Sequence, residues 1–230
     1  MRTLFRLVLA LSTSCLLFGC GGSNSAPQVG TFEIKVLWPA DRLLPVDSLS
    51  VVATLSDSKG NVLGTQLLAR PTSGSTITTA DFDNVPVGKV MLAASAYPTA
   101  QGTGVAQAVG SAPGTVSAGQ KTTIDVTMAD TIVKVTITPA NPTVAVQGQL
   151  QLTMTAYDAE NDVVLTSPNT TSWSPPPGSD EVATVDSTGL MTGIGAGSGQ
   201  VSVTETESGV SGTTSVTVTS GNGGLIGTIQ

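Results

Sequence analysis

The sequence predicts an all-β protein built from two antiparallel β-sandwiches in tandem. Apolar and polar residues alternate with a period of two in one segment after another, which is the pattern of half-buried strands. Clusters of Gly and Pro separate these segments about every 8 to 12 residues, the turn spacing that is typical of sandwiches. No stretch after the first 19 residues shows a sustained helical period.

The composition divides the chain into five parts. Residues 1–19 form a leader, and residues 20–29 are rich in Gly and Ser and predict a flexible tether. Residues 30–130 and 131–219 are each about as long as one sandwich of about 100 residues, enough for one hydrophobic core apiece. Residues 220–230 form a Gly-rich tail.

The first sandwich is expected to contain at least five strands. Four alternating runs predict residues that point into its core: Phe32, Ile34 and Val36; Val51, Ala53 and Leu55; Val90, Leu92 and Ala94; and Ile124, Val126 and Met128. The polar stretch from Asp57 to Asn61 predicts a hairpin turn, from which the chain returns as a further strand.

The second sandwich shows the same pattern. Its expected inward-facing residues are Val133, Val135 and Ile137; Leu150, Leu152, Met154 and Ala156; Val201 and Val203; and Val216 and Val218. Asp186 to Gly189 predicts a turn in which Gly189 takes a positive φ. Leu190 to Ile194 is expected to return as the next strand.

The leader has the organisation of a secretion signal. Arg2 and Arg6 supply the positive charge, and an apolar run from Leu7 to Phe18 follows. This run is too short to span a bilayer, which takes about 20 residues.

The end of the leader, Leu17-Phe18-Gly19-Cys20, resembles the lipobox of bacterial lipoproteins. The resemblance implies cleavage before Cys20, a diacylglyceryl group on its thiol, labelling by palmitate, and attachment to a membrane of the cell envelope. Gly21 stands where Asp tends to retain such proteins in the inner membrane, so the outer membrane is favoured. The alternative is an ordinary secretory signal, which would leave Cys20 as a free thiol.

Residues 131–219 resemble the bacterial Ig-like domain of group 2, the module of intimin- and invasin-type adhesins. The stretch from Val182 to Gly197 carries most of this resemblance, since it reads Val-Ala-Thr-Val-Asp-Ser-Thr-Gly-Leu-Met-Thr-Gly-Ile-Gly-Ala-Gly. The resemblance implies a non-catalytic spacer or adhesion module with Trp173 in its core. A Pro-rich insert at 175–178 departs from the family pattern.

The first sandwich bears a more limited resemblance to transthyretin-like and carboxypeptidase-regulatory-like domains. It lies in the stretch from Asp81 to Leu92, which contains Phe82, Val85-Pro86 and Gly88 at the family's spacing. The resemblance implies a seven-stranded sandwich that serves as a surface or carbohydrate-associated accessory.

The composition argues against several classes of function. The chain has no His, and its second cysteine, Cys15, lies inside the leader, so the exported protein has no internal disulfide. We therefore expect no catalytic residues, no metal site, no cofactor and no enzyme activity. A net charge of −7 argues against a nucleic-acid partner.

These features favour a non-enzymatic, lipid-anchored envelope protein that displays its modules for adhesion, presentation or envelope structure, with a protein or glycan partner at the cell surface. The alternative is a carbohydrate-binding accessory lipoprotein, in which Trp38 and Tyr97 stack on a sugar ring. A third hypothesis is calcium binding by the oxygens of Asp158, Glu160, Asn161 and Asp162.

Overall fold

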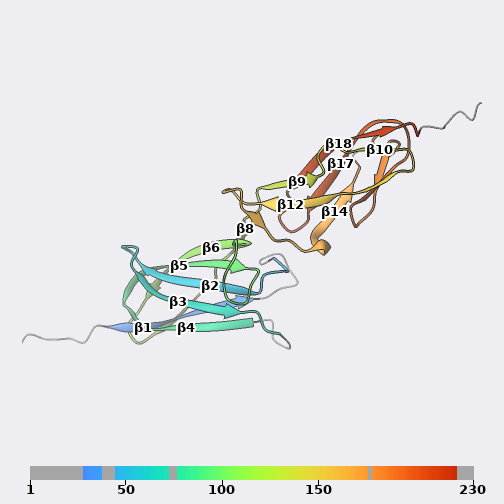
Figure 1. The fold of residues 1–230 in the computed structure, drawn as a ribbon. Coiled ribbons are helices and arrows are strands. Elements are labelled where there is room, and N and C mark those ends of the chain that lie inside the picture. Colours follow the sequence, from blue (N-terminus) through green and yellow to red (C-terminus); the bar gives the residue numbers. More distant parts are fainter. Residues whose placement is uncertain (1–27, 38–44, 73–76, 176–177, 222–230) are drawn as a thin grey trace, which may run out of the picture.

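The computed structural model describes residues 28–37, 45–72, 77–175 and 178–221. These residues form strands, turns and one short 3₁₀ helix, η1 (Pro168–Thr170), and no α-helix occurs among them. The all-β class is therefore confirmed. The strands surround two separate hydrophobic cores, which lie one after the other along the chain (Figure 1).

The first sandwich packs a three-stranded sheet against a five-stranded sheet. The small sheet has the order β4-β1-β7, and the large sheet has the order β3-β2-β5-β6-β8. Their bounds are β1 (Val29–Leu37), β2 (Ser50–Asp57), β3 (Val62–Ala69), β4 (Ile77–Pro86), β5 (Gly88–Tyr97), β6 (Ala108–Val116), β7 (Lys121–Ile124) and β8 (Ala129–Asp130).

The first core lies between these two sheets. The alternation predicted for β1, β2 and β5 is confirmed, because all nine inward-facing residues named above for these strands are buried. The rings of Phe32 and Phe82 meet edge to face across β1 and β4, with centroids 6.2 Å apart. Val85 is also buried, so the stretch from Asp81 to Leu92 supplies core residues.

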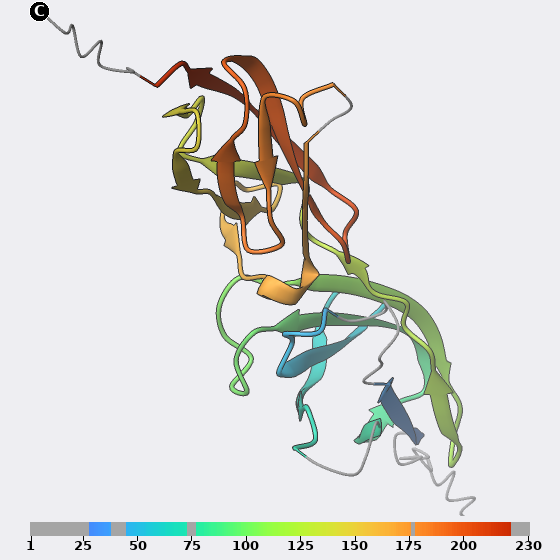
Figure 2. The same ribbon diagram turned by 90° about the vertical axis from the view of Figure 1, so that its right-hand side faces the viewer.

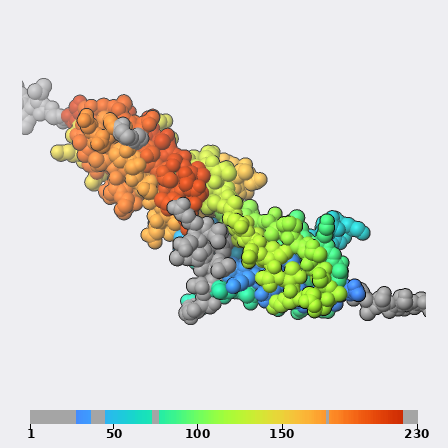
Figure 3. Space-filling model, turned by 180° about the vertical axis from the view of Figure 1, so that it is seen from behind, coloured from blue at the N-terminus to red at the C-terminus, as the bar shows by residue number. Residues whose placement is uncertain are grey.

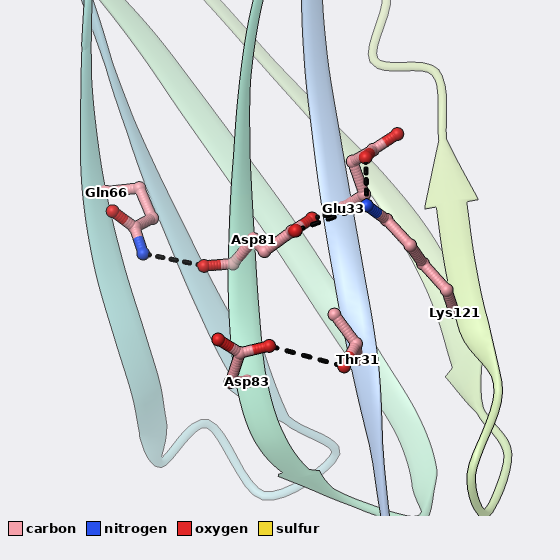
Figure 4. Close-up of polar contacts among 6 residues, drawn as sticks. All are labelled: Thr31, Glu33, Gln66, Asp81, Asp83 and Lys121. Carbon is pink, nitrogen blue, oxygen red and sulfur yellow. Dashed lines mark hydrogen bonds and ion pairs between the residues drawn. The ribbon is translucent and has the colours of Figure 1, made fainter.

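A cluster of charged side chains holds the small sheet together on its outer face (Figure 4). Lys121 on β7 contacts the Glu33 carboxylate on β1 and lies 3.0 Å from Asp81 Oδ1 on β4. These hydrogen bonds, first to Glu33 and then to Asp81, raise the pKa of the Lys121 ammonium. Beside them, the Thr31 hydroxyl donates to Asp83 across 3.3 Å. Side chains from all three strands thus reinforce a sheet in which β7 pairs over only four residues.

The second sandwich consists of one four-stranded and two three-stranded sheets. Their orders are β10-β18-β17-β14, β13-β12-β9 and β11-β16-β15. The bounds are β9 (Lys134–Thr138), β10 (Thr143–Ala145), β11 (Gln149–Gln151), β12 (Thr153–Tyr157), β13 (Val163–Val164), β14 (Thr171–Ser174), β15 (Ala183–Val185), β16 (Leu190–Gly193), β17 (Gly197–Glu205) and β18 (Ser211–Thr219).

Most of the predicted second core is confirmed. Val201, Val203, Val216 and Val218 are buried on the long hairpin of β17 and β18, opposite Leu152 on the other side of the core. Trp173 packs against this core as predicted, although its side chain is only half-buried.

Three hairpin turns share one construction, which begins with an Asp and has a residue of positive φ three positions later. Asp57, Asp158 and Asp186 each accept through Oδ1 from the backbone N–H four residues on, at 2.8 to 3.0 Å. The residues of positive φ are Gly60, Asn161 and Gly189. The turns predicted at Asp57 and Asp186 are confirmed, and so is the positive φ of Gly189, at 84°.

The structure differs from the sequence-based expectation in three places. Val133 is not in the core, since its side chain is 58% exposed; β9 begins only at Lys134, and Ile132 is buried instead. Strand β7 ends at Ile124, although Val126 and Met128 still pack against the first core. Two strand pairs, β1 with β7 and β10 with β18, are parallel in otherwise antiparallel sheets.

The two sandwiches lie end to end. Figure 2 shows the second sandwich above the first, and the yellow-green segment after β8 passes from one lobe to the other in the space-filling view (Figure 3). The chain enters the first sandwich at the end far from the second: Gln28 accepts from the Val87 N–H, where β5 begins, whereas β5 ends at Tyr97 beside the junction. The C-terminal end of β18 likewise lies far from the junction (Figure 1).

Candidate functional site

Several residues to which the sequence assigned a role lie outside the described part of the chain. Cys20, the expected lipid attachment site, is one of them, and Trp38, the expected partner of Tyr97 in sugar stacking, is another. Tyr97 itself is half-buried at the end of β5, where it pairs with Ser50.

In the turn from Asp158 to Asp162, two of the side chains considered as calcium ligands already accept hydrogen bonds from within the chain. Asp158 Oδ1 accepts from the Asp162 N–H at 2.8 Å, and Asn161 Oδ1 accepts from the Lys134 ammonium at 3.1 Å. A cation therefore already contacts one of the proposed ligands. Within the described residues, no three Asp, Glu, His or Cys side chains are placed to hold a metal ion together.

The junction between the two sandwiches is centred on one buried amide. Gln107 is 1% exposed, and its side chain has a partner in each sandwich. Its Oε1 accepts from the Ser48 hydroxyl at 2.9 Å, and its Nε2 donates to the Leu165 carbonyl at 2.8 Å. Its backbone carbonyl accepts from the N–H of Thr131, the residue at which the second segment begins. Gln107 is thus hydrogen-bonded to the first sandwich, to the second sandwich and to the segment at Thr131 that connects them.

A second bond between the sandwiches comes from a carboxylate. Glu207, in the β17–β18 turn, accepts through Oε1 from the Val46 N–H at 3.0 Å. The neighbouring Glu205 is 1% exposed and accepts from the backbone N–H groups of Glu207 and Ser208. Asp130, at the end of β8, accepts from the Ile132 N–H at 2.7 Å.

Four carboxylates, of Asp47, Asp130, Glu205 and Glu207, therefore gather at the junction. Burial raises the pKa of Asp130 and of Glu207, and the charge of Glu205 adds to both increases. Hydrogen bonds from the Ile132 and Val46 N–H groups oppose these two increases.

The pKa of Asp47 is raised as well. Burial raises its pKa, the Arg70 guanidinium opposes the increase, and the charge of Glu205 adds to it. Arg70 also donates to the carbonyls of Val46 and Ser48, which fixes the loop that carries Asp47. Asp47, Asp130 and Glu207 thus bind protons more readily than exposed carboxylates do.

The second sandwich also has a groove of about 610 Å³, between the open edges of its sheets. Strand β14 pairs only with β17, and residues 153–155 of β12 pair only with β9, so each strand leaves an edge free on the groove side. Leu152, Met154 and Trp173 supply the apolar part of the lining. The sequence predicted Trp173 as a core residue and gave no sign of the groove, which depends on where two sheet edges end.

No family model matches the sequence, and no curated protein matches it. Among solved structures, the chain is similar to domains 4 and 5 of the S-layer protein SbsC, with a TM-score of 0.33 and 13% identity over 60% of this chain and 69% of that one. It is also similar to a C-terminal 282-residue fragment of intimin, solved in complex with the intimin-binding domain of its translocated receptor. There the TM-score is 0.31 and the identity 17%, over 80% of this chain and 56% of the fragment.

The chain thus spans little more than half of the intimin fragment. A third similar structure, extracellular domains 3–5 of Drosophila OTK, has a TM-score of 0.24 and 11% identity, over 84% of this chain and 63% of that one. Because TM-scores of this size do not establish a shared fold, the architecture described above rests on the strand pairing of the chain itself. No helix among the described residues is long and apolar enough to cross a membrane.

Proposed function

We propose that this chain is a non-enzymatic protein of the cell envelope, held by a lipid on Cys20, which displays two β-sandwiches in a fixed end-to-end arrangement. The observation that carries the proposal is the bonded junction. Gln107 and Glu207 each connect the two sandwiches through a hydrogen bond. A rigid junction suits display, adhesion or envelope structure, because it keeps the outer module extended away from the first sandwich.

The direction of the chain supports this arrangement. The described chain enters the first sandwich at the end opposite the junction, because the Gln28 carbonyl accepts from the Val87 N–H there and β1 begins at Val29. Strand β5 runs ten residues from that end to Tyr97, which at about 3.3 Å per residue places the junction roughly 30 Å further from the anchor. The second sandwich would then be the outermost module, available to a protein or glycan partner.

The proposed anchor depends on the leader and the lipobox. A single acyl chain binds a membrane only marginally, whereas two or more hold a protein firmly. A diacylglyceryl Cys20 would meet that requirement without a membrane-spanning segment. Gly21 in the following position favours the outer membrane.

Labelling with palmitate in a bacterial host tests the anchor. The wild-type chain should incorporate the label and fractionate with membranes, whereas Cys20→Ser should do neither. Cys15→Ser is the matched control, because it removes the other cysteine and should label like wild type. Equal labelling of wild type and Cys20→Ser would contradict the proposal, and a wild type without label would favour an ordinary secretory signal.

A further inference from the structure

We infer that the groove between β12 and β14 binds an uncharged saccharide. This site lies in the second sandwich, at a distance in the sequence from Trp38 and Tyr97, and the inference is independent of the anchor on Cys20. Its volume of about 610 Å³ is within the range of small-ligand sites, which is about 300 to 1,000 Å³.

The chemistry of the groove lining matches a neutral sugar. None of the residues that line it is charged, although the chain as a whole is acidic. The indole of Trp173 and the side chain of Met154 provide an apolar surface of the kind on which the C–H face of a pyranose can stack. The remaining lining is dominated by hydroxyl and amide groups, which can both donate and accept hydrogen bonds as sugar hydroxyls do.

Several of these polar groups have no hydrogen-bond partner among the described residues. The side chains of Thr153, Asn169 and Ser187 line the groove and are exposed, and they make no hydrogen bond within the described residues. They come from three separate elements, β12, η1 and the β15–β16 turn. A ligand in the groove can therefore bond to groups from three elements at once.

The walls of the groove are held in place by the fold. Gln151 Nε2 donates to the carbonyls of Leu152 and Thr188, which ties the β15–β16 turn to the strand beside it. Gly189 in that turn lies against the indole, since a Cβ at this position would be 3.0 Å from Trp173 Cε2. On the other side, the Thr170 carbonyl accepts from Thr206 N–H at 2.7 Å. Walls that are already ordered lose little conformational entropy when a ligand binds.

An extended peptide is the other occupant that a site between two sheet edges could accept, by pairing with a free strand edge. The groove offers free side-chain hydroxyls and an amide around an aromatic surface, and these groups favour the sugar. The two occupants are separated by experiment.

The full-length protein carrying Trp38→Phe leaves Trp173 as the single tryptophan, because the chain contains two. Its fluorescence would be titrated with neutral oligosaccharides of glucose, mannose, galactose and N-acetylglucosamine. An oligogalacturonate serves as the anionic arm, and an alternating Val-Thr peptide serves as the peptide arm. The inference predicts saturable changes in Trp173 fluorescence with at least one neutral oligosaccharide and none with the other two arms.

Variants locate the binding in the groove. Thr153→Ala and Asn169→Ala should each weaken binding about fivefold to tenfold, the effect of losing about one hydrogen bond. Thr184→Ala, an exposed threonine of the same sandwich outside the groove, should bind like the parent. Circular dichroism should show the same fold for all three. The inference is overturned if no neutral sugar binds, if the groove variants bind as well as Thr184→Ala, or if only the peptide binds.

Discussion

At the scale of single residues, Gln107 has the largest consequence for the molecule. Its amide is buried and makes two hydrogen bonds. The oxygen accepts from Ser48 in the first sandwich, and the nitrogen donates to Leu165 in the second. Nothing in the local sequence distinguishes this glutamine from the exposed polar residues around it. Its role depends on a contact between segments 58 residues apart, which sequence periodicity does not report.

Replacing Gln107 by Leu should destabilise the protein. The change leaves the Ser48 hydroxyl and the Leu165 carbonyl without their partner. Ser48 is fully buried, and an unpaired buried group costs about 1 to 3 kcal/mol. We expect a loss of about that size or more in the free energy of unfolding, measured by urea denaturation of the full chain.

Gln66→Leu is the matched control, because Gln66 is only half-buried and its side chain makes one hydrogen bond, to the Asp81 carbonyl. Its effect should stay within about 0.5 kcal/mol. Equal effects of the two substitutions would contradict the role assigned to Gln107.

The turn aspartates act through local hydrogen bonds. Asp186 accepts from the hydroxyl and N–H of Thr188 and from the Leu190 N–H, and these bonds lower the pKa of its carboxyl. A lowered pKa means that the stabilisation is present at neutral pH and is lost as the pH falls through the folded-state value.

Asp186→Ala should therefore lower the melting temperature at pH 7 by a few degrees, and the difference from wild type should shrink as the pH falls toward 3. Ser187→Ala, in the same turn, is the control and should leave the melting temperature nearly unchanged. A deficit of Asp186→Ala that stays constant with pH would contradict this explanation.

At the scale of elements, the sequence predicted strands that alternate clearly and strands that follow a recognisable turn, and it did not predict strands with neither signal. β1, β2, β5 and β18 bury alternate residues over most of their length, and β17 does so from Val201 onward, so alternation in the sequence predicts these strands. β4 buries only Phe82 and Val85, and most of its other residues are exposed. β6 contains Pro113, which lies where β6 pairs only with β5, so the missing N–H can face an open edge.

The hairpin of β15 and β16 depends on Gly189 in two ways. Its φ of 84° disfavours any side chain, and a Cβ would lie 2.7 Å from the Leu152 carbonyl. Gly60 in the β2–β3 turn has nearly the same φ, 85°, but has open space around it.

Gly60→Ala should cost about 1 to 2 kcal/mol for the backbone conformation alone. Gly189→Ala should cost clearly more, because the methyl group also collides with the carbonyl and the indole. Thermal denaturation of the two variants measures the difference, and equal losses would show that the packing around Gly189 contributes nothing.

At the scale of the whole molecule, the carboxylates make the junction sensitive to pH. The pKa values of Asp47, Asp130 and Glu207 are raised, so the folded junction binds protons more tightly than the unfolded chain does. Their effect on stability is most favourable below the unfolded-state pKa, about 4, and is lost as the pH rises through the folded values. The turn aspartates Asp57 and Asp186 respond in the opposite direction.

Asp130→Asn should raise the melting temperature at pH 7, because the amide keeps an oxygen for the Ile132 N–H and removes one charge from the cluster. The gain should diminish as the pH falls toward 5. Asp125→Asn serves as the control in the same segment of chain. A gain that is the same at both pH values would contradict the explanation from charge.

The position of the junction could be anticipated from the sequence only as a boundary near residue 130. The change of pattern there predicts where one segment stops and the next starts. The residues that bond across it come from four separate loops or strand ends, and only the fold brings Val46, Gln107, Leu165 and Glu207 together. The groove beside Trp173 has the same origin, since its lining comes from β11, β12, β14, η1 with the loop before it, and the β15–β16 turn.

The central claim is that the junction holds the two sandwiches as one unit, and residual dipolar couplings measure this most directly. The full chain carrying Cys20→Ser would be aligned weakly at pH 6, and backbone couplings would be collected for residues of both sandwiches. We predict that one alignment tensor fits both sets, and that Gln107→Leu makes the two tensors diverge. Two unequal tensors in the protein with Gln107 intact would contradict the claim.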